Sequence, residues 1–295
     1  MTTITRSKGL ASSLVAVSLI VLLRTLLPNA VCAQTPALLW NTSVGATLFA
    51  LDAQTNAYAN AGGNVIVLNG DGVSVQTNAV CPRAGLARRD SAGNYYFAGI
   101  LSAGMNNYDF PPQDFKGVTL SNNPVYLAKF SSAGELLWVT NFGTTVATAS
   151  YVVGVADLVL DADENPIVGY VSGKSGSYGG TIMSFEAGGG ARWSTGVGIG
   201  LTLGTFRLTS ASPTNLYALA YIESPLAANW YRIDGSGTKT YLASWSISTD
   251  AYYFKSRTIL NTDGELYNIE DSSLVKKSSS LSVVWGVSLG SYRRL

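Results

Sequence analysis

The sequence predicts an all-β fold, a β-propeller of about five four-stranded blades, from three observations. A short polar phrase typical of a turn occurs five times, and a strand-like segment follows each copy. Tryptophans recur between the copies, at intervals of about 50 residues in the second half of the chain. The segments between these markers are rich in Val, Ile, Tyr and Phe and are separated by Gly- and Asp-rich turns, as short antiparallel strands are.

The turn phrase has the form Asp-x-x-Gly-Asn or a variant of it. Its five copies are Asp52–Asn56, Asp90–Asn94, Asp161–Asn165, Ala211–Asn215 and Asn261–Glu265. Asp and Asn side chains cap tight turns, and Gly supplies the positive φ angle that such turns require. We therefore interpret the phrase as structural punctuation between two strands of one blade.

Six boundary positions separate the repeat units: Trp40, Val75 in the place of a tryptophan, Trp138, Trp193, Trp245 and Trp285. A tryptophan on an outer strand can cover the gap between neighbouring sheets, so we expect these residues to pack between blades. The first unit is the shortest and lacks a tryptophan at its end. We expect the first blade to be the thinnest and the least well packed.

Three of the units can be divided into four strands each. The predicted strands are 85–89, 94–99, 125–130 and 135–139 in the second unit, 156–160, 166–169, 181–185 and 191–193 in the third, and 206–208, 216–219, 230–233 and 241–245 in the fourth. Four short strands per unit are typical of a propeller blade. The segments 102–123 and 173–180 are expected to be irregular loops.

Ring closure has two interpretations. Leu38–Trp40 resembles one more outer strand, which either latches the first and last blades together or shows that the ring is incomplete and part of a larger one.

The N-terminus predicts a signal peptide over residues 1–33. Arg6 and Lys8 precede the apolar run Ala11–Leu23, and Val31–Ala33 offers small residues at the cleavage position. The run has about 13 residues, fewer than the roughly 20 that cross a bilayer, so no permanent membrane span is expected after cleavage. We expect residues 34–295 to form the propeller domain of a secreted, extracellular or cell-surface protein, with the periplasm as the alternative location.

Composition excludes some classes of partner. Only 13% of the residues are charged and the net charge is +1, so the chain has no basic field for nucleic acid. After signal cleavage Cys81 is the only cysteine, and we interpret it as a buried apolar residue, with Arg83, Arg88 and Arg89 nearby in sequence.

The stretch from Asp90 to Gly143 resembles the bacterial β-propeller repeat known as the SBBP repeat. The matching residues are Asp90, Gly93, Asn94, Tyr96, Gly99, Asp109, Phe110, Lys129, Phe130, Gly134, Leu137, Trp138, Phe142 and Gly143. The match weakens in other units, where Glu164 replaces Gly and Ala211 replaces Asp. The resemblance implies a secreted or surface propeller and supplies no catalytic residue.

The chain contains no histidine, which removes Ser-His-Asp and Cys-His nucleophiles and the usual zinc sites. No catalytic or cofactor-binding residue is predicted. The acidic residues that a carboxylate-dependent enzyme could use are Asp161, Asp163, Glu223, Asp234, Asp263 and Glu270. Asp161, Asp163 and Asn165 have the spacing that begins a calcium loop, but the later Gly and Glu of such a loop are missing, so calcium is the secondary interpretation and no metal the primary one.

Two functions are compatible with these features. The favoured hypothesis is a non-catalytic binding scaffold for an extracellular protein or glycan, whose loops project from a rigid ring. The alternative is a carboxylate-dependent hydrolase or lyase that acts on polysaccharide or peptide at the central channel. Acidic side chains around the channel would favour the alternative; Ser, Thr and aliphatic side chains would favour the scaffold.

Overall fold

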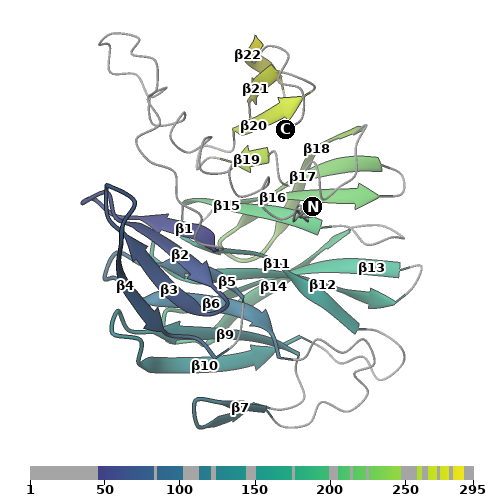
Figure 1. The fold of residues 1–295 in the computed structure, drawn as a ribbon. Helices are drawn as coiled ribbons and strands as arrows, with labels where there is room; N and C mark the ends of the chain where they lie inside the picture. The colour runs from purple at the N-terminus through teal and green to yellow at the C-terminus, as the bar shows by residue number, and fades with distance from the viewer. Residues whose placement is uncertain are drawn as a thin grey trace, which may run out of the picture.

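The computed structural model describes residues 46–82, 85–101, 113–120, 124–143, 151–174, 177–198, 205–212, 215–223, 226–246, 258–260, 265–270, 273–278 and 282–288. These residues form five four-stranded antiparallel sheets, which are the blades of a β-propeller (Figure 1). The predicted all-β, five-bladed fold is confirmed. Among the described residues, no helix is long and apolar enough to span a bilayer.

Each blade is numbered by its order along the chain. Blade one contains β1 (Thr47–Leu51), β2 (Ala57–Ala61), β3 (Asn64–Leu68) and β4 (Ser74–Ala79). Blade two contains β5 (Leu86–Arg89), β6 (Tyr95–Ile100), β9 (Val125–Phe130) and β10 (Leu136–Phe142). Blade three contains β11 (Tyr151–Leu160), β12 (Pro166–Lys174), β13 (Ser177–Phe185) and β14 (Ala191–Gly198). Blade four contains β15 (Thr205–Ser212), β16 (Asn215–Glu223), β17 (Leu226–Asp234) and β18 (Lys239–Ser246). Blade five contains β19 (Thr258–Leu260), β20 (Leu266–Glu270), β21 (Ser273–Lys277) and β22 (Val283–Ser288).

The first strand of each blade lies toward the centre of the ring. β1 contacts β5, β5 contacts β11, β11 contacts β15 and β15 contacts β19, whereas the fourth strand is the outer edge of each sheet. The chain thus runs outward in every blade and returns to the centre to begin the next. We call the link between the first and second strands the first turn, and the link between the third and fourth strands the second turn.

Both faces of the middle strands are buried, and each face belongs to a different gap between blades. On β6, Tyr95 and Phe97 pack with blade one, whereas Tyr96 and Ala98 pack with blade three. Alternation of side chains along a strand explains this division. A strand buried on both faces has no polar side, which is why the segment Tyr95–Ile100 is continuously apolar.

The outer strands share an irregularity just after the second turn. In blades one, two, three and five the ladder skips one residue of the outer strand, and these bulged residues are Val75, Leu137, Arg192 and Val284. Trp138, Trp193 and Trp285 each follow the bulge directly. The residue in that register in blade one is Gln76, so the assignment of Val75 to the tryptophan position is wrong by one residue. Blade four differs from this pattern. Its register shift lies between Trp230 and Tyr231 of β17, and Trp245 does not follow the bulge directly but pairs with Ala228.

Two of the tryptophans lie on the next blade, as predicted. A β-carbon on Gly189 would stand 3.0 Å from the Trp138 ring, and one on Gly237 would stand 3.0 Å from the Trp193 ring. Both glycines are in second turns, at φ of 90° and 85°. At the gap between blades one and two, Val80 takes this role against Gly134, at 3.6 Å. The side chain of Trp245 lies outside the described residues.

Two loop expectations change. The segment 173–180 is mostly strand, because β12 continues to Lys174 and β13 begins at Ser177. Within 102–123 the chain forms a hairpin of β7 (Gln113–Phe115) and β8 (Val118–Leu120). Phe115 and Leu120 are buried against blade two and give this hairpin its anchor.

Blade one is a complete sheet, but its strands of five or six residues are shorter than the strands of eight to ten residues in blades three and four. Its side toward blade two is well packed, with Val65 and Val80 fully buried. Cys81 is a buried thiol whose Sγ lies 3.6 Å from the Tyr126 hydroxyl, and its burial is what the apolar interpretation predicts. The signal peptide of residues 1–33, the segment Leu38–Trp40 and the pair Asp109–Phe110 lie outside the described residues.

Candidate functional site

The first turns of blades one, two and three have one geometry. The Asp carboxylate that opens each turn accepts a hydrogen bond from the backbone N–H four residues later, at 2.8 Å for Asp52, 2.7 Å for Asp90 and 2.8 Å for Asp161. Its second oxygen accepts from the Asn amide at that same position. The carboxylates therefore cap the turns, as the interpretation of the repeated phrase predicts.

The calcium candidates belong to one of these turns. Asp161 Oδ1 accepts from the backbone N–H groups of Asp163 and Asn165, at 3.0 and 2.8 Å. Its Oδ2 lies 3.0 Å from Arg192 Nη1, and its side chain is 2% exposed. The structure thus brings Asp161 and Asn165 together and pairs the carboxylate with a cation. Calcium binding stays a prediction of the sequence; within the described residues no group of three His, Cys, Asp or Glu side chains is placed to hold a metal.

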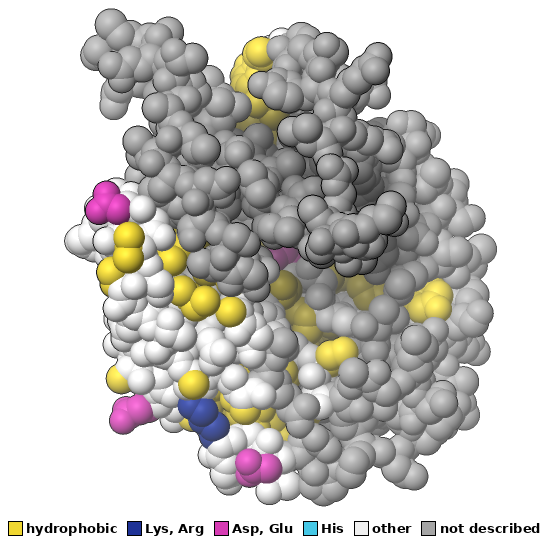
Figure 2. All heavy atoms as spheres, in the orientation of Figure 1, with side chains coloured by type: hydrophobic (Ala, Val, Ile, Leu, Met, Phe, Trp, Pro, Cys, Tyr) yellow, Lys and Arg dark blue, Asp and Glu magenta, His cyan; other side chains and the backbone are white. Residues whose placement is uncertain are grey.

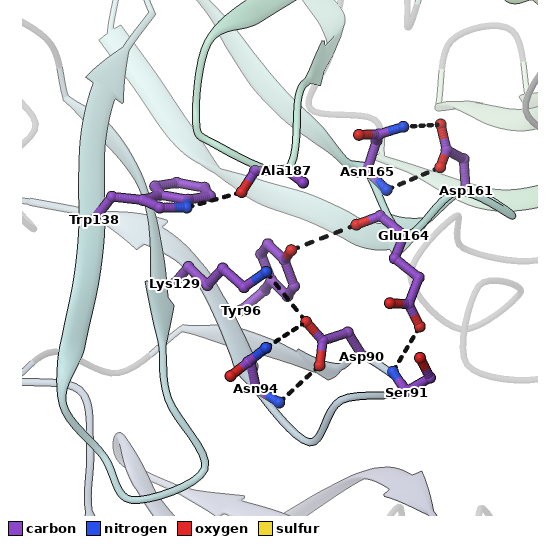
Figure 3. A network of polar contacts seen from close by, with 10 residues as sticks. All are labelled: Asp90, Ser91, Asn94, Tyr96, Lys129, Trp138, Asp161, Glu164, Asn165 and Ala187. Atoms are coloured by element: carbon purple, nitrogen blue, oxygen red, sulfur yellow. Dashed lines mark hydrogen bonds and ion pairs between the residues drawn. The ribbon is translucent and has the colours of Figure 1, made fainter.

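A row of three side chains crosses blade two beside its capped turn (Figure 3). Lys129 Nζ lies 3.2 Å from Asp90 Oδ2 and 4.7 Å from the centre of the Tyr96 ring. The Trp138 ring meets Tyr96 edge-on at 6.0 Å. Burial alone would lower the pKa of Lys129, but its contacts with Tyr96 and Asp90 outweigh burial and raise that pKa. The lysine is therefore held as a cation in an ion pair.

The same region of blade two is joined to blade three by three contacts (Figure 3). Trp138 Nε1 donates to the Ala187 carbonyl at 2.9 Å. Ser91 N–H donates to Glu164 Oε1 at 2.6 Å, and the Tyr96 hydroxyl donates to the Glu164 carbonyl at 3.4 Å. These polar groups fasten neighbouring blades to each other, which is a structural role.

A second charged cluster lies on the inner strands of blades two, three and four. Asp157 on β11 is buried, with Oδ1 3.3 Å from Arg88 Nη2 and Oδ2 accepting from the backbone N–H of Leu208 at 3.0 Å. Leu208 is on β15, the innermost strand of its sheet, whose free edge faces the centre of the ring. One carboxylate therefore bridges three consecutive blades near the axis.

The charges around Asp157 influence one another. The pKa of the Arg88 guanidinium is lowered by burial and by the positive charge of Arg207, while Asp157 opposes the shift. The inner strands thus present two arginines and one buried carboxylate at this level.

The acidic residues named for the hydrolase alternative lie in different places. Asp161 caps the first turn of blade three, and Asp234 opens the second turn of blade four, where it accepts from Ser236 and Thr238. Glu223 and Glu270 end β16 and β20, and Asp263 lies outside the described residues. The described residues place Asp161 and Asp234 in turns and Glu223 and Glu270 at strand ends, spread over blades three, four and five.

Sequence reasoning missed Asp157 and the role of Arg88. The signal was present, because Asp157 is a lone charge inside the apolar segment Tyr151–Leu160. A buried charge requires a partner, and that rule predicts a cation nearby. Its identity could not follow, since Arg88 lies in another blade and was considered only as a neighbour of Cys81 in sequence.

Comparison with known proteins gives weak likenesses of the whole chain. No family model matches, and no curated protein matches. A protein of unknown function from Bacteroides caccae has 14% identity and a TM-score of 0.47, with 84% of each chain covered. A protein from Lactobacillus plantarum has 14% identity and a TM-score of 0.46, covering 80% of this chain and 69% of its own. A gluconolactonase from Xanthomonas campestris has 11% identity and a TM-score of 0.45, covering 82% and 74%. The assignment as a propeller rests on the five sheets themselves, and the resemblance to the SBBP repeat stays a prediction.

Proposed function

We propose that this protein is a non-catalytic, exported binding scaffold that displays an inserted hairpin from a rigid five-bladed ring. The observation that carries the proposal is that the connection between the second and third strands is much longer in blade two than in the other blades. Between second and third strands, blades one, three, four and five use short links, whereas blade two inserts residues 101–124 and the hairpin β7–β8. An elaborated loop on a rigid frame is a common way to present a binding surface.

The hairpin is held from one side and open on the other. Phe115 is buried and packs against Tyr126 with ring centres 5.0 Å apart, and Lys116 Nζ donates to the Gly134 carbonyl at 3.0 Å. Val118 on the next strand is 40% exposed. A fixed hairpin with an outward apolar residue supports contact with an extracellular protein or glycan at low entropic cost.

Binding is tested by thermal unfolding of residues 34–295 against soluble glycans, peptidoglycan fragments and candidate surface proteins. A ligand of the native state raises the melting temperature. A ligand found in this way is then measured against Val118→Glu and, as a matched control, Val75→Glu, which introduces the same charge at a 57% exposed valine on β4. The proposal expects weaker binding for Val118→Glu alone.

Two results would contradict the proposal. Equal losses of binding affinity in the two glutamate variants would show that the hairpin is not part of the binding surface. Release of reducing ends or peptide fragments during incubation with a ligand would show that the protein is an enzyme, in favour of the hydrolase or lyase alternative. Export itself is checked by sequencing the N-terminus of the mature protein, which should begin at Gln34.

A further inference from the structure

Blade five carries the same row of side chains as blade two. Lys276 lies opposite Trp285 in the strand register, as Lys129 lies opposite Trp138. Lys276 Nζ stands 5.6 Å from the centre of the Tyr267 ring, and Trp285 meets that ring edge-on at 6.1 Å. The carboxylate partner is Glu265, at 2.8 Å from Lys276 Nζ. Both blades therefore offer the same kind of surface beside their outer strand.

In blade two, the second turn of blade three covers this surface. Its Ala187 carbonyl accepts from Trp138 Nε1, and Gly189 brings its backbone against the indole ring. A β-carbon at Gly189 would lie only 3.0 Å from that ring, and φ there is 90°. The surface therefore accepts a turn whose fourth residue is a glycine in the left-handed region.

The row in blade five is more open than its counterpart. Tyr267 is half-buried, whereas its counterpart Tyr96 is fully buried, and the Lys276 side chain is 19% exposed, against 13% for Lys129. β22 beside it exposes Val283, Val284 and Val287 to between 53% and 63%. The greater exposure of the tyrosine and the lysine is what the loss of a covering turn would produce.

Blade one has a turn of the required shape. In the segment from Asn69 to Val73, Asn69 N–H donates to the Val73 carbonyl and Gly72 N–H donates to the Asn69 carbonyl, each at 2.9 Å. The turn of blade three has the same two bonds, from Glu186 to Gly190 and from Gly189 to Glu186, at 2.7 and 2.9 Å. Gly72 has φ of 76° and corresponds to Gly189. In a closed propeller the last blade is the neighbour of the first.

We propose that the row Tyr267–Lys276–Trp285 of blade five is the docking surface for the second turn of blade one. Trp285 packs on Gly72, and its Nε1 donates to the carbonyl of Gly70, which corresponds to Ala187. The ring is then closed by the contact that joins blades two and three, without help from a further strand. This inference does not depend on the proposed binding function.

Disulfide trapping tests the contact directly, in a chain that carries Cys81→Ala. The variant pair Gly72→Cys and Trp285→Cys examines closure. The pair Trp193→Cys and Gly237→Cys is the matched control, since a β-carbon on Gly237 would stand 3.1 Å from Trp193 Cβ, close to the roughly 3.5–4.5 Å of disulfides. A disulfide within one molecule for both pairs is expected. Trapping of the control pair alone, or a 72–285 disulfide that forms only between molecules, overturns the proposal, and the second result assigns the surface to another copy of the chain.

A double-mutant cycle gives an answer without cysteines. Gly72→Ala and Trp285→Phe are combined, and the shift in melting temperature is compared with the two single shifts; Gly72→Ala with Trp138→Phe is the control. Contacting residues are non-additive, and distant ones add. The proposal expects non-additivity for the first pair only. Additive shifts in both pairs overturn it even if the cysteine variants do not fold.

Discussion

The indole Nε1 of Trp138 donates a 2.9 Å hydrogen bond to the carbonyl of Ala187 in the next blade. Trp193 holds the equivalent position one blade further on, but its Nε1 is buried and has no hydrogen-bond partner among the described residues. The two residues have the same strand register, and each packs on a glycine of the next blade. They differ in the hydrogen bond of the indole Nε1. A comparison of the two residues therefore distinguishes the contribution of indole packing from that of the indole hydrogen bond.

Trp138→Phe should therefore destabilise the protein more than Trp193→Phe. The first change removes a bond and the second removes a buried donor that has no acceptor, so we expect a gap of about 1 kcal/mol in the free energy of unfolding. Urea unfolding of the two variants measures it. Equal losses in the free energy of unfolding would mean that packing of the indole alone accounts for both effects.

Gly169 is predicted to be one of the least tolerant positions in the described chain. A β-carbon there would lie 2.0 Å from Cε2 of Phe206, which inserts from blade four. Gly169→Ala should cost about 2–3 kcal/mol through overpacking. Gly179→Ala, in the same sheet with no atom within 4 Å of the added carbon, is the control and should change stability little. Partial recovery by Phe206→Leu in the Gly169→Ala background would identify the ring as the cause.

Thr55 occupies a turn position that suits glycine. Its φ is 68°, in the left-handed region that β-branched residues avoid. Thr55→Gly should stabilise the protein by about 1 kcal/mol, measured as an increase in the urea midpoint. Gly134→Ala provides the converse, because φ there is 86° and the nearest atom to the new carbon is 3.6 Å away, so only backbone strain is added. Destabilisation by both variants would contradict the argument from φ.

The carboxylate of Asp234 should contribute to the pH dependence of stability. The Ser236 hydroxyl first, and then backbone N–H groups of Thr238 and Ser236, lower its pKa from 3.8. A group whose pKa is lower in the folded state stabilises that state above the unfolded pKa and loses this effect as the pH falls through the folded pKa. The difference in melting temperature between the wild type and Asp234→Asn should thus be constant near pH 6 and shrink below about pH 4. A difference that persists unchanged at pH 2 would exclude titration of Asp234 as its source.

Removal of the axial carboxylate should be costly. Asp157→Ala leaves the Leu208 N–H without its acceptor and Arg88 without its counter-charge, and the loss of one partner of such a pair typically costs about 3–5 kcal/mol. Adding Arg88→Met should recover part of the loss, since the uncompensated cation is then gone. Chemical denaturation of the single and double variants measures this coupling. A double variant that is less stable by the sum of both single losses would contradict the ion pair.

Much of the blade architecture could be predicted because the signals are local. The strand 125–130 and the turn that follows it depend on neighbouring residues, and both are in the predicted place. The register of the tryptophans could be predicted only in part. A one-residue bulge moves the equivalent position from Val75 to Gln76, and sequence spacing does not reveal where a ladder skips a residue.

The candidate sites were less predictable, because they join blades that are distant in sequence. Arg88 and Asp157 are 69 positions apart, and Trp138 and Ala187 are 49 apart. The turn carboxylates, by contrast, accept hydrogen bonds from the residue four positions later. The hairpin of β7 and β8 was also missed, since two three-residue strands carry too little periodicity to distinguish them from a loop.

The Trp-on-turn contact has a direction, because a tryptophan of blade two lies on the second turn of blade three, and a tryptophan of blade three lies on the second turn of blade four. Trp138 lies on Gly189 and Trp193 lies on Gly237, so at both joints an outer strand of one blade meets a second turn of the same form in the next blade. If the segment between two such tryptophans were deleted, the remaining tryptophan would lie against the second turn of a later blade, which has the same form as the turn it lost. Recombination of whole units could in this way change the number of blades in descendants of this gene while preserving the type of joint that holds them together.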